Sequence, residues 1–312
     1  MLLFFSPIII IFLTLISLFI IILIISCFEL KTYKINEFYV KNNKNSEKFK
    51  IVYISDFHNK LYKNDNDDLV CDILNTNPDY IFLGGDFIIY SIFEGIFDKI
   101  EIDNAIKFIY KLKQKIDKKR SDHNYNLKRI FFSYGNHELR FNKVKNKPEL
   151  LEKYNKFIEA MKECDIEILD NETLSLNDGA TISSLSLYDG YYANIFLKKK
   201  YFKHISKDLL QQIFNNLDDK KYNIVMFHKP DYADDLLNFG FDFVLSGHNH
   251  GGLINFPIIG AIFSPEFRPF PKYNKGLYEV SGKNVLVSSG IGEHFLKIRV
   301  NNMPEICVVN IE

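Results

Sequence analysis

Histidine is scarce in this chain, and most of it lies where short apolar runs end. The 312 residues include eight histidines, and five of them follow runs rich in aromatic and β-branched residues. Such runs are typical of short buried strands. The HxH pair in FDFVLSGHNHGG is weak evidence by itself, because a solvated or hydrogen-bonded histidine is the more common case. Evidence for a metal site must therefore come from the residues around the other histidines.

Acidic and amide side chains occupy the same kind of position. Asp56 and His58 follow the run KIVYIS, Asp86 follows DYIFLGG, and Asn136 and His137 follow RIFFSYG. The runs NIVMF and FDFVLSG lead to further histidines. The carboxyl ends of strands are where open α/β sheets gather ligand-binding groups. Five strand ends that each deliver Asp, Asn or His therefore predict one site.

The residue types predict the chemistry of that site. Carboxylate oxygens, an amide oxygen and neutral imidazoles suit borderline divalent metals such as Mn, Fe, Zn or Co. The four cysteines lie outside all five motifs, which argues against a thiolate zinc site. Seven candidate ligands are too many for one tetrahedral ion, but they fit two ions about 3.5 to 4 Å apart that share a carboxylate, as in phosphoryl transfer. We therefore expect two divalent metal ions.

The ordered blocks DFH, GGD, GNHE, H and GHNH resemble those of the calcineurin-like metallophosphoesterases. The resemblance extends from Lys50 to about the C-terminus, and it implies an α/β fold, a four-layer α-β-β-α sandwich, and a metal-dependent phosphohydrolase. It implies that the first metal is bound by Asp56, His58, Asp86 and His250. It implies that the second is bound by the bridging Asp86 together with Asn136, His228 and His248. His137 would be the catalytic acid that protonates the leaving oxygen.

The C-terminal part of the sequence resembles one branch of this family. GHNHGG, followed by KGLYEVSGKNVLVSSGIG and KIRVNNMPEI, is similar to the ending of bacterial membrane-associated phosphodiesterases, a branch that includes hydrolases of nucleotide-linked lipid A precursors. Many members read SRG where this chain has Ser288, Ser289 and Gly290, and Pro before the late arginine, here Arg299. These differences predict that a basic substrate contact is missing.

Another departure concerns the catalytic histidine. Family members often carry an Asp three residues after the bridging carboxylate, where it orients that histidine, but this chain has Ile89 there. Glu138 cannot be assumed to replace it, because adjacent side chains usually diverge. We expect Glu138 either at the surface or behind the metal ligands. Lys229 and Arg140 are candidates for phosphate contacts, or equally for solvated charges, because each lies near a predicted ligand.

Residues 189–202, DGYYANIFLKKKYF, place three tyrosines between the GNHE and HKP blocks. The segment could form a flap over the metal site, but an edge hairpin with ordinary surface tyrosines is the more common case. Helical spacing predicts helices in DDLVCDILNTNPD and over Asp98 to Ile116, Pro148 to Cys164 and Lys207 to Leu217.

The segment from Leu2 to Phe28 contains no charged residue. As a helix it would be about 40 Å long, against a hydrocarbon core of about 30 Å, so it predicts a transmembrane anchor. The alternatives are a buried core helix, a cleaved signal peptide, and a lipoprotein signal in which Cys27 is lipidated. We expect three parts: an anchor over 1–28, a linker over 29–49 and a catalytic domain over 50–312.

Charge bears on the partners and on the location. The 39 basic and 39 acidic residues balance, so no global positive field favours nucleic acid. Basic residues follow the apolar segment, and the positive-inside rule then favours a cytoplasmic catalytic domain in a single-pass membrane protein. A lipoprotein would place the domain outside. The lysines concerned are Lys31, Lys34, Lys41, Lys44, Lys48 and Lys50.

These patterns together predict a membrane-anchored phosphoesterase with two metals. We expect it to hydrolyse phosphodiester or pyrophosphate bonds, with a lipid-linked phosphoester as the candidate substrate because the anchor keeps the site near the lipid surface. One alternative is a metal-binding scaffold with little catalytic activity at the membrane, suggested by Ile89. Another is a nuclease of the same fold, against which the lack of a basic stripe argues.

Overall fold

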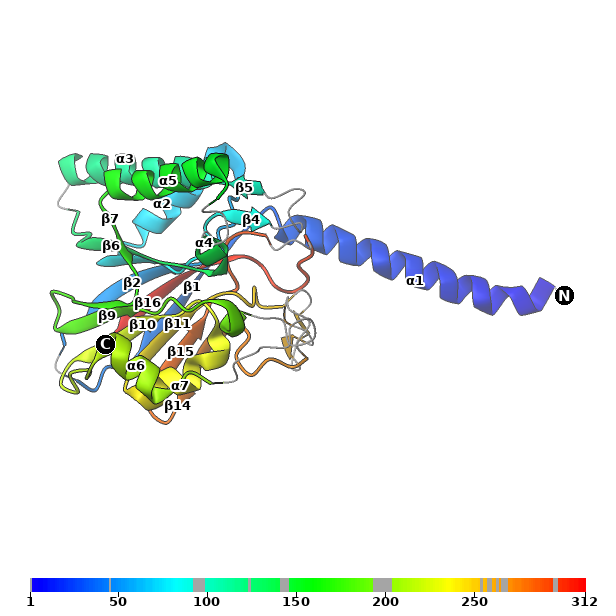
Figure 1. Cartoon of the computed structure of the whole chain (residues 1–312). Coiled ribbons are helices and arrows are strands. Elements are labelled where there is room, and N and C mark those ends of the chain that lie inside the picture. Colours follow the sequence, from blue (N-terminus) through cyan, green and yellow to red (C-terminus); the bar gives the residue numbers. More distant parts are fainter. Residues whose placement is uncertain are drawn as a thin grey trace.

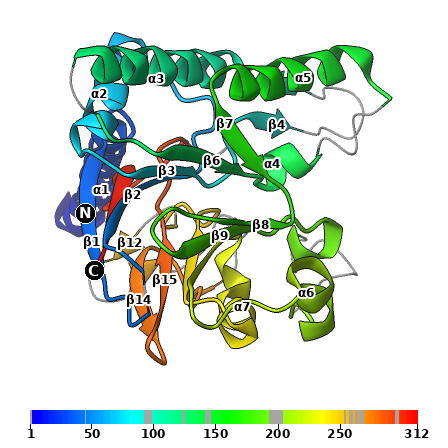
Figure 2. The ribbon, with the colours of Figure 1, turned by 90° about the vertical axis from the view of Figure 1, so that its left-hand side faces the viewer.

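The computed structural model describes residues 2–44, 46–91, 99–122, 125–140, 146–192, 204–252, 255–256, 260–261, 264, 269–293 and 297–312. Within them, two six-stranded sheets lie face to face, and helices cover the outer face of each sheet (Figures 1 and 2). This arrangement confirms the predicted four-layer α-β-β-α sandwich.

The first sheet joins the two ends of the chain. The edge strand β1 (Lys34–Val40) runs parallel to β16 (Glu305–Ile311), which pairs antiparallel with β2 (Phe49–Ile54). The strands β3 (Tyr80–Leu83), β6 (Arg129–Ser133) and β7 (Ile166–Leu169) follow in this order and run parallel to β2.

The second sheet has parallel strands at its centre and an antiparallel strand at each edge. The order is β14 (Gly276–Val280), β15 (Lys283–Val287), β11 (Phe243–Ser246), β10 (Tyr222–Met226), β9 (Ala180–Ser184) and β8 (Glu172–Ser175). Two short antiparallel pairs complete the strands: β4 (Ile89–Ser91) with β5 (Lys99–Glu101), and β12 (Asn255–Phe256) with β13 (Gly260–Ala261).

The layers follow from side-chain alternation along the strands, whose neighbouring residues point to opposite faces. Ile51 and Tyr53 of β2 pack against the second sheet, with Ile224 of β10 in the same buried cluster. Val52 and Ile54 of β2 point the other way, to the helices on the outer face. Those helices are α2 (Asp67–Asn75), α3 (Asp103–Asp122) and α5 (Pro148–Glu163).

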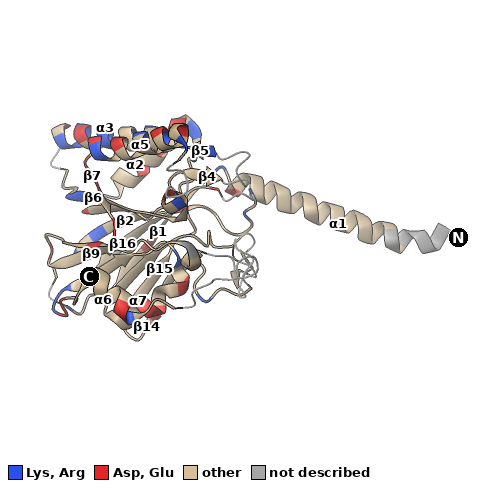
Figure 3. Cartoon of the chain, viewed as in Figure 1, with Lys and Arg blue, Asp and Glu red and all other residues tan. Residues whose placement is uncertain are grey.

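The outer face of the second sheet packs against α6 (Lys207–Phe214) and α7 (Ala233–Phe239). The remaining helical segments are short: η1 (Lys63–Asn66), α4 (Asn136–Leu139), η3 (Asp189–Tyr192) and η4 (Pro230–Tyr232). Acidic and basic residues are interspersed along α3 and α5 (Figure 3).

Helix α1 (Leu2–Glu29) leaves the sandwich on the side where α4 and β4 lie (Figure 1). Its stretch Ile9–Glu29 has a mean hydropathy of 3.3 and is only 6% buried, so it is long and apolar enough to cross a membrane. A signal sequence near an N-terminus has the same properties. A buried core helix, the other alternative, does not fit the exposure of Ile11 and Phe12.

Two sequence-based boundaries differ from the structure. The stretch 29–49, expected as a linker, contains β1, which pairs with β16 near the other end of the chain. The helix expected from Asp98 starts at Asp103, because Lys99–Glu101 forms β5 and pairs with β4. The other three predicted helices correspond to α2, α5 and α6.

Candidate metal centre

The seven predicted ligands lie at the carboxyl ends of five strands. The first sheet contributes Asp56 and His58 after β2, Asp86 after β3 and Asn136 at the start of α4, after β6. The second sheet contributes His228 after β10, and His248 and His250 after β11. The structure thus brings six of the seven side chains together from both sheets, and it places Asn136 next to His137 at the start of α4.

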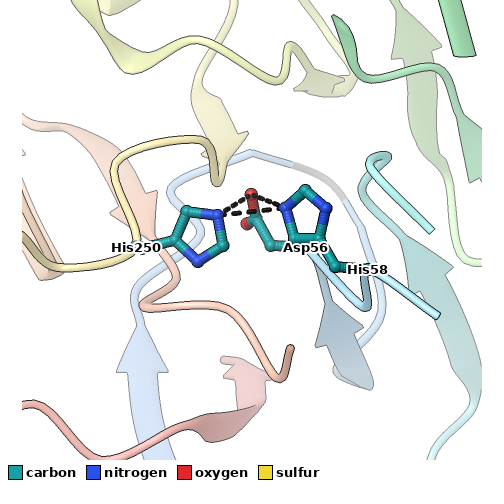
Figure 4. A group of neighbouring side chains, drawn as sticks. All are labelled: Asp56, His58 and His250. Carbon is teal, nitrogen blue, oxygen red and sulfur yellow. Dashed lines mark hydrogen bonds and ion pairs between the residues drawn. The ribbon is translucent and has the colours of Figure 1, made fainter. Parts of the chain in front are cut away.

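One group of possible ligand atoms consists of Asp56, His58 and His250. The two imidazole rings lie on either side of the Asp56 carboxylate (Figure 4). Asp56 Oδ1 is 3.3 Å from His250 Nε2 and 3.9 Å from His58 Nε2. The two Nε2 atoms are 3.1 Å apart. These three residues all belong to the set predicted for the first metal.

A second group consists of Asp86, His228 and His248, which belong to the set predicted for the second metal. Asp86 Oδ2 is 3.1 Å from His228 Nε2 and 3.8 Å from His58 Nε2, so this carboxylate lies between the two groups. Asn136 Oδ1 is buried without a hydrogen-bond partner. A buried amide oxygen without a partner is costly, and a cation would satisfy it.

The tautomer of His228 fits metal binding. Its Nδ1 lies 2.8 Å from the carbonyl oxygen of Gly84, so Nδ1 is the donor and Nε2 faces the two carboxylates. Histidine ligands usually donate their second ring nitrogen in this way. Burial alone would lower the pKa of His228, but the Asp86 and Asp56 carboxylates raise it to about 10. The negative charge that attracts this proton would equally attract a divalent cation.

The two carboxylates differ in their electrostatic environment. Burial raises the pKa of Asp56, and Asp86 adds to that shift, although His228 opposes it. Burial also acts to raise the pKa of Asp86, but the nearby imidazoles of His228, His137 and His58 lower it well below its usual value. Asp86 is therefore the carboxylate that is held ionised among the histidines.

The backbone at the centre is strained. Five of the seven predicted ligands are non-glycine residues with positive φ, at 52° for Asp56, 44° for His58, 53° for Asp86, 66° for His248 and 47° for His250. Such conformations cost about 1–3 kcal/mol each when the surrounding structure must impose them, and they concentrate at functional sites. The strain at the strand exits is therefore a mark of function independent of the sequence motif.

Two glycines let the backbone approach these carboxylates. A Cβ at Gly135 would collide with Asp86 Oδ1, and a Cβ at Gly247 would collide with Asp56 Oδ2. The glycines of GNHE and GHNH are thus required by close packing, because any side chain would displace a predicted ligand.

Glu138 is the residue whose importance the sequence left open. It is fully buried and accepts hydrogen bonds from the backbone N–H groups of Asp86 (2.9 Å), Phe87 (2.8 Å), Ile88 (3.2 Å) and Gly135 (2.9 Å). Burial and the Asp86 carboxylate raise its pKa to about 7, while these backbone donors favour the ionised form. Glu138 therefore fixes the turn after β3 to the start of α4, behind the predicted ligands.

His137 is oriented by backbone groups. Its Nδ1 accepts a hydrogen bond of 2.8 Å from the backbone N–H of Tyr90, and the backbone N–H of His137 donates to Asp86 Oδ1 at 2.8 Å. An accepting Nδ1 places the proton of a neutral ring on Nε2, which lies 3.8 Å from Asp86 Oδ2. The Tyr90 N–H thus orients the His137 ring, a role that an Asp at position 89 often has in family members.

The other candidate contacts have varied environments. Arg140 donates to the carbonyl oxygen of Tyr90 at 3.1 Å, and Lys229 is buried, so neither side chain is a simple solvated charge. Arg299 is also buried and donates to the carbonyl oxygens of Ser289 and Gly292. In the suggested flap, the Tyr192 ring lies 5.5 Å from the His248 ring, and residues 193–202 lie outside the described residues.

Comparisons with known proteins agree with this geometry. Residues 49–252 match the family model for calcineurin-like phosphoesterases. The uncharacterized metallophosphoesterase YkuE of Bacillus subtilis strain 168 is 32% identical over 142 residues, which are 45% of this chain and 44% of that protein. The uncharacterized metallophosphoesterase Cj0846 of Campylobacter jejuni is 28% identical over 271 residues, which are 84% of this chain and 59% of that protein.

A third relative has a more specific name. The phosphodiesterase YaeI of Escherichia coli K12 is 27% identical over 88 residues, which are 28% of this chain and 32% of that protein. Each of these matches spans less than two thirds of the relative's own length.

Proposed function

Because this chain belongs to the calcineurin-like phosphoesterase family, we propose that it is a phosphohydrolase that uses two divalent ions. The observation that carries the proposal is the convergence of two buried ligand groups, one around Asp56 and one around Asp86, with His58 close to both carboxylates. Seven ligand atoms in this arrangement exceed the needs of one tetrahedral ion. The donor set fits Mn, Fe, Zn or Co.

The residues of the chain have separable roles in this proposal. Asp56, His58 and His250 would hold one ion, and Asp86 would contribute to both ion sites. The second ion would also be held by Asn136, His228 and His248. When bound, divalent ions supply Lewis acidity, which lowers the pKa of water and offsets negative charge on phosphoryl oxygens.

His137 would act on the leaving oxygen. Its Nε2 faces the same space as Asp86 Oδ2, and the Tyr90 amide fixes the ring. A neutral ring with its proton on Nε2 can donate a hydrogen bond to that oxygen. The role of His137 as a full proton donor stays a prediction, because proton transfer would require the ring to give up its only N–H proton or to gain a second one at Nδ1.

We further propose that α1 remains attached and anchors the protein in a membrane. The last turns of the helix support this, since Ser26 and Glu29 are buried and accept hydrogen bonds from the backbone N–H groups of Arg299 (3.0 Å) and Asn302 (2.9 Å). Removal of α1 as a signal peptide would break both contacts. Cleavage before Cys27, as in a lipoprotein, would remove Ser26.

The natural substrate that we propose is a lipid-linked phosphodiester or pyrophosphate. Only residues 30–33 separate α1 from β1, so the domain cannot move far from the membrane surface. Tethering raises the effective concentration of any substrate in the same membrane without a new contact. The exposed Lys31 and Lys34 directly after α1 support a cytoplasmic domain by the positive-inside rule.

The test uses the full-length protein in detergent and in phospholipid vesicles, stripped of metal and reloaded with Mn. The substrates are a phosphomonoester, bis(p-nitrophenyl) phosphate, a pyrophosphate-linked lipid and single-stranded DNA, and the His137→Ala variant controls for contaminating activity. We expect the lipid in vesicles to be hydrolysed fastest.

Three other outcomes would contradict parts of the proposal. Two bound ions without turnover of any substrate would favour the metal-binding scaffold. Fastest cleavage of DNA would favour a nuclease. Cleavage of soluble diesters far faster than any lipid would leave the phosphoesterase assignment intact and remove the lipid hypothesis.

A further inference from the structure

The end of α1 contacts the loops that carry predicted metal ligands. Arg299 and Asn302 donate their backbone N–H groups to Ser26 and Glu29, as described above, and Lys60 Nζ donates to the carbonyl oxygen of Leu30 at 2.7 Å. Lys60 lies two residues after His58. The apolar helix is therefore bonded to the domain at two points, and Leu30, the residue after it, at a third.

Asn302 connects the Glu29 contact to His250. Its side chain is fully buried, and its Nδ2 donates to the carbonyl oxygens of His250 and Gly252. Glu29 Oε2 fixes the backbone of the same asparagine. One residue thus separates the carboxylate at the end of α1 from a predicted metal ligand.

The segment that Asn302 holds is one that needs support. His250, Gly251 and Gly252 have φ values of 47°, 66° and 79°, so three successive residues are left-handed. A strained backbone persists only when its surroundings determine it. Asparagine amides bind all three carbonyl oxygens, since Asn274 and Asn255 donate to Gly251 at 2.8 and 3.0 Å.

Arg299 supports the other side of the same region. Its guanidinium donates to the carbonyl oxygens of Ser289 (2.8 Å), Gly292 (2.9 Å) and Asn302 (3.0 Å), and Nη2 lies 3.4 Å from His250 Nδ1. Its backbone is the group that Ser26 binds. Two contacts of α1 therefore reach His250, one through Asn302 and one through Arg299.

We propose that the last turn of α1 is part of the framework that positions His250, with Glu29 and Ser26 as positioning residues for the metal centre. The proposal rests on the proposed metal-binding role of His250. It means that the apolar helix does more than set location, because the site would keep its full metal affinity only while the end of α1 is in place. Residues that orient metal ligands typically contribute about 10- to 100-fold to metal affinity or activity.

The test compares full-length variants in detergent by titration of the metal-free protein with Mn²⁺, followed by kcat and KM for bis(p-nitrophenyl) phosphate at saturating Mn²⁺. Glu29→Ala removes the acceptor of the Asn302 N–H, whereas Glu29→Gln keeps an acceptor oxygen. Ser17→Ala is the matched control, because the Ser17 hydroxyl bonds only within α1, to the Thr14 carbonyl oxygen. Ser26→Ala is a milder second variant that removes the other contact.

We expect Glu29→Ala to weaken the binding of one Mn²⁺ equivalent by about 10-fold or more. Saturating Mn²⁺ should restore kcat, and Glu29→Gln should bind Mn²⁺ to within about threefold of the wild type. Ser26→Ala should weaken binding by a smaller factor, and Ser17→Ala should not change it.

Unchanged Mn²⁺ affinity in both Glu29→Ala and Ser26→Ala would overturn the proposal. So would equal losses in Glu29→Ala and Ser17→Ala, because they would indicate a general defect of the helix. A wild-type protein that binds one ion would contradict the dinuclear function, but the difference between variant and wild type would still test the positioning role on that ion.

Discussion

The two sheets contribute different chemistry to one centre. The first sheet carries all three predicted oxygen ligands, Asp56, Asp86 and Asn136, whereas the predicted ligands of the second sheet are all imidazoles. The supports differ as well. Glu138, a carboxylate, accepts from backbone N–H groups on the first side. On the second side, asparagine amides such as Asn302 donate to backbone carbonyl oxygens.

The difference shows how strained turns can be held by opposite means. The turn after β3 presents its N–H groups inward, so an acceptor with two oxygens can bind several of them. The turn after β11 presents its carbonyl oxygens, so it needs hydrogen-bond donors. Asparagine provides such donors. Variants that affect both sides, one side or neither side should therefore have successively smaller effects on metal binding and turnover.

Asp86→Ala should have the largest effect, because Asp86 lies between the two ligand groups. We expect both ions to be lost, and turnover to fall by more than the roughly 10³-fold that one oriented stabilising group can contribute. Elemental analysis after reconstitution with excess Mn²⁺ and dialysis measures the ions. The exposed Asp219→Ala is the control. Retention of one tightly bound ion with good activity would show that another residue bridges the sites.

His137→Ala should leave both ions bound and lower turnover by about 10²- to 10⁴-fold. The loss should be smaller for a nitrophenolate leaving group than for an alkoxide, because a good leaving group needs less help. His137→Gln keeps an N–H donor without a transferable proton, and we expect it to be about tenfold more active than the alanine variant, the worth of one hydrogen bond.

Kinetics with matched leaving groups check this expectation. Equal losses for both leaving groups would argue against contact between His137 and the leaving oxygen. Equal activity of the glutamine and alanine variants, with a strong leaving-group dependence, would support proton transfer over a hydrogen bond.

Glu138→Gln should act on the turn after β3, on the first side of the centre. Glutamine has one acceptor oxygen, so it leaves buried N–H donors of the Asp86 turn without partners, at a cost of about 1–3 kcal/mol for each donor. We expect the binding of the ion at Asp86 and Asn136 to weaken by about 10- to 100-fold, with the ion at His250 less affected. Mn²⁺ titration measures both, and the exposed Glu279→Gln is the control. Equal weakening of both ions would show that the turn after β3 supports the two ion sites alike, through the shared Asp86.

The sequence could predict that the candidate ligands lie at strand ends, because a motif at a strand end is local. The role of Glu138 could not be predicted in the same way, because three of its four partners, Asp86, Phe87 and Ile88, lie 50 to 52 residues earlier in the chain. The adjacent side chains of His137 and Glu138 do diverge, since His137 faces Asp86 Oδ2 while Glu138 lies behind the turn after β3. Where the Glu138 side chain is buried, however, depends on tertiary contacts.

The same limit applies to the stretch KINEFYV. It reads as a charged linker, but it forms the edge strand β1, with mostly exposed or half-buried side chains. Its partner β16 begins at Glu305, so no local pattern indicates the pairing. The contacts of Ser26 and Glu29 have the same origin, because Arg299 and Asn302 are also near the other end of the chain.

Ile89→Asp should have the smallest effect, although it restores the residue that related proteins often carry. The Tyr90 N–H already binds His137 Nδ1, so a carboxylate at position 89 would have to displace that amide to bind the same nitrogen. Position 89 also pairs with Glu101 across β4 and β5, and two like charges directly opposite destabilise a strand pair by about 0.2–1 kcal/mol. We therefore expect kcat to change by less than about threefold, with slightly lower thermal stability. Ile89→Asn is the matched control, because it has the same shape without the charge, and it should keep the stability that the aspartate variant loses. A rise in kcat of tenfold or more in the aspartate variant alone would show that the Tyr90 amide orients His137 poorly. The first side of the centre would then lack a carboxylate that orients His137, and no residue of the second side would take its place.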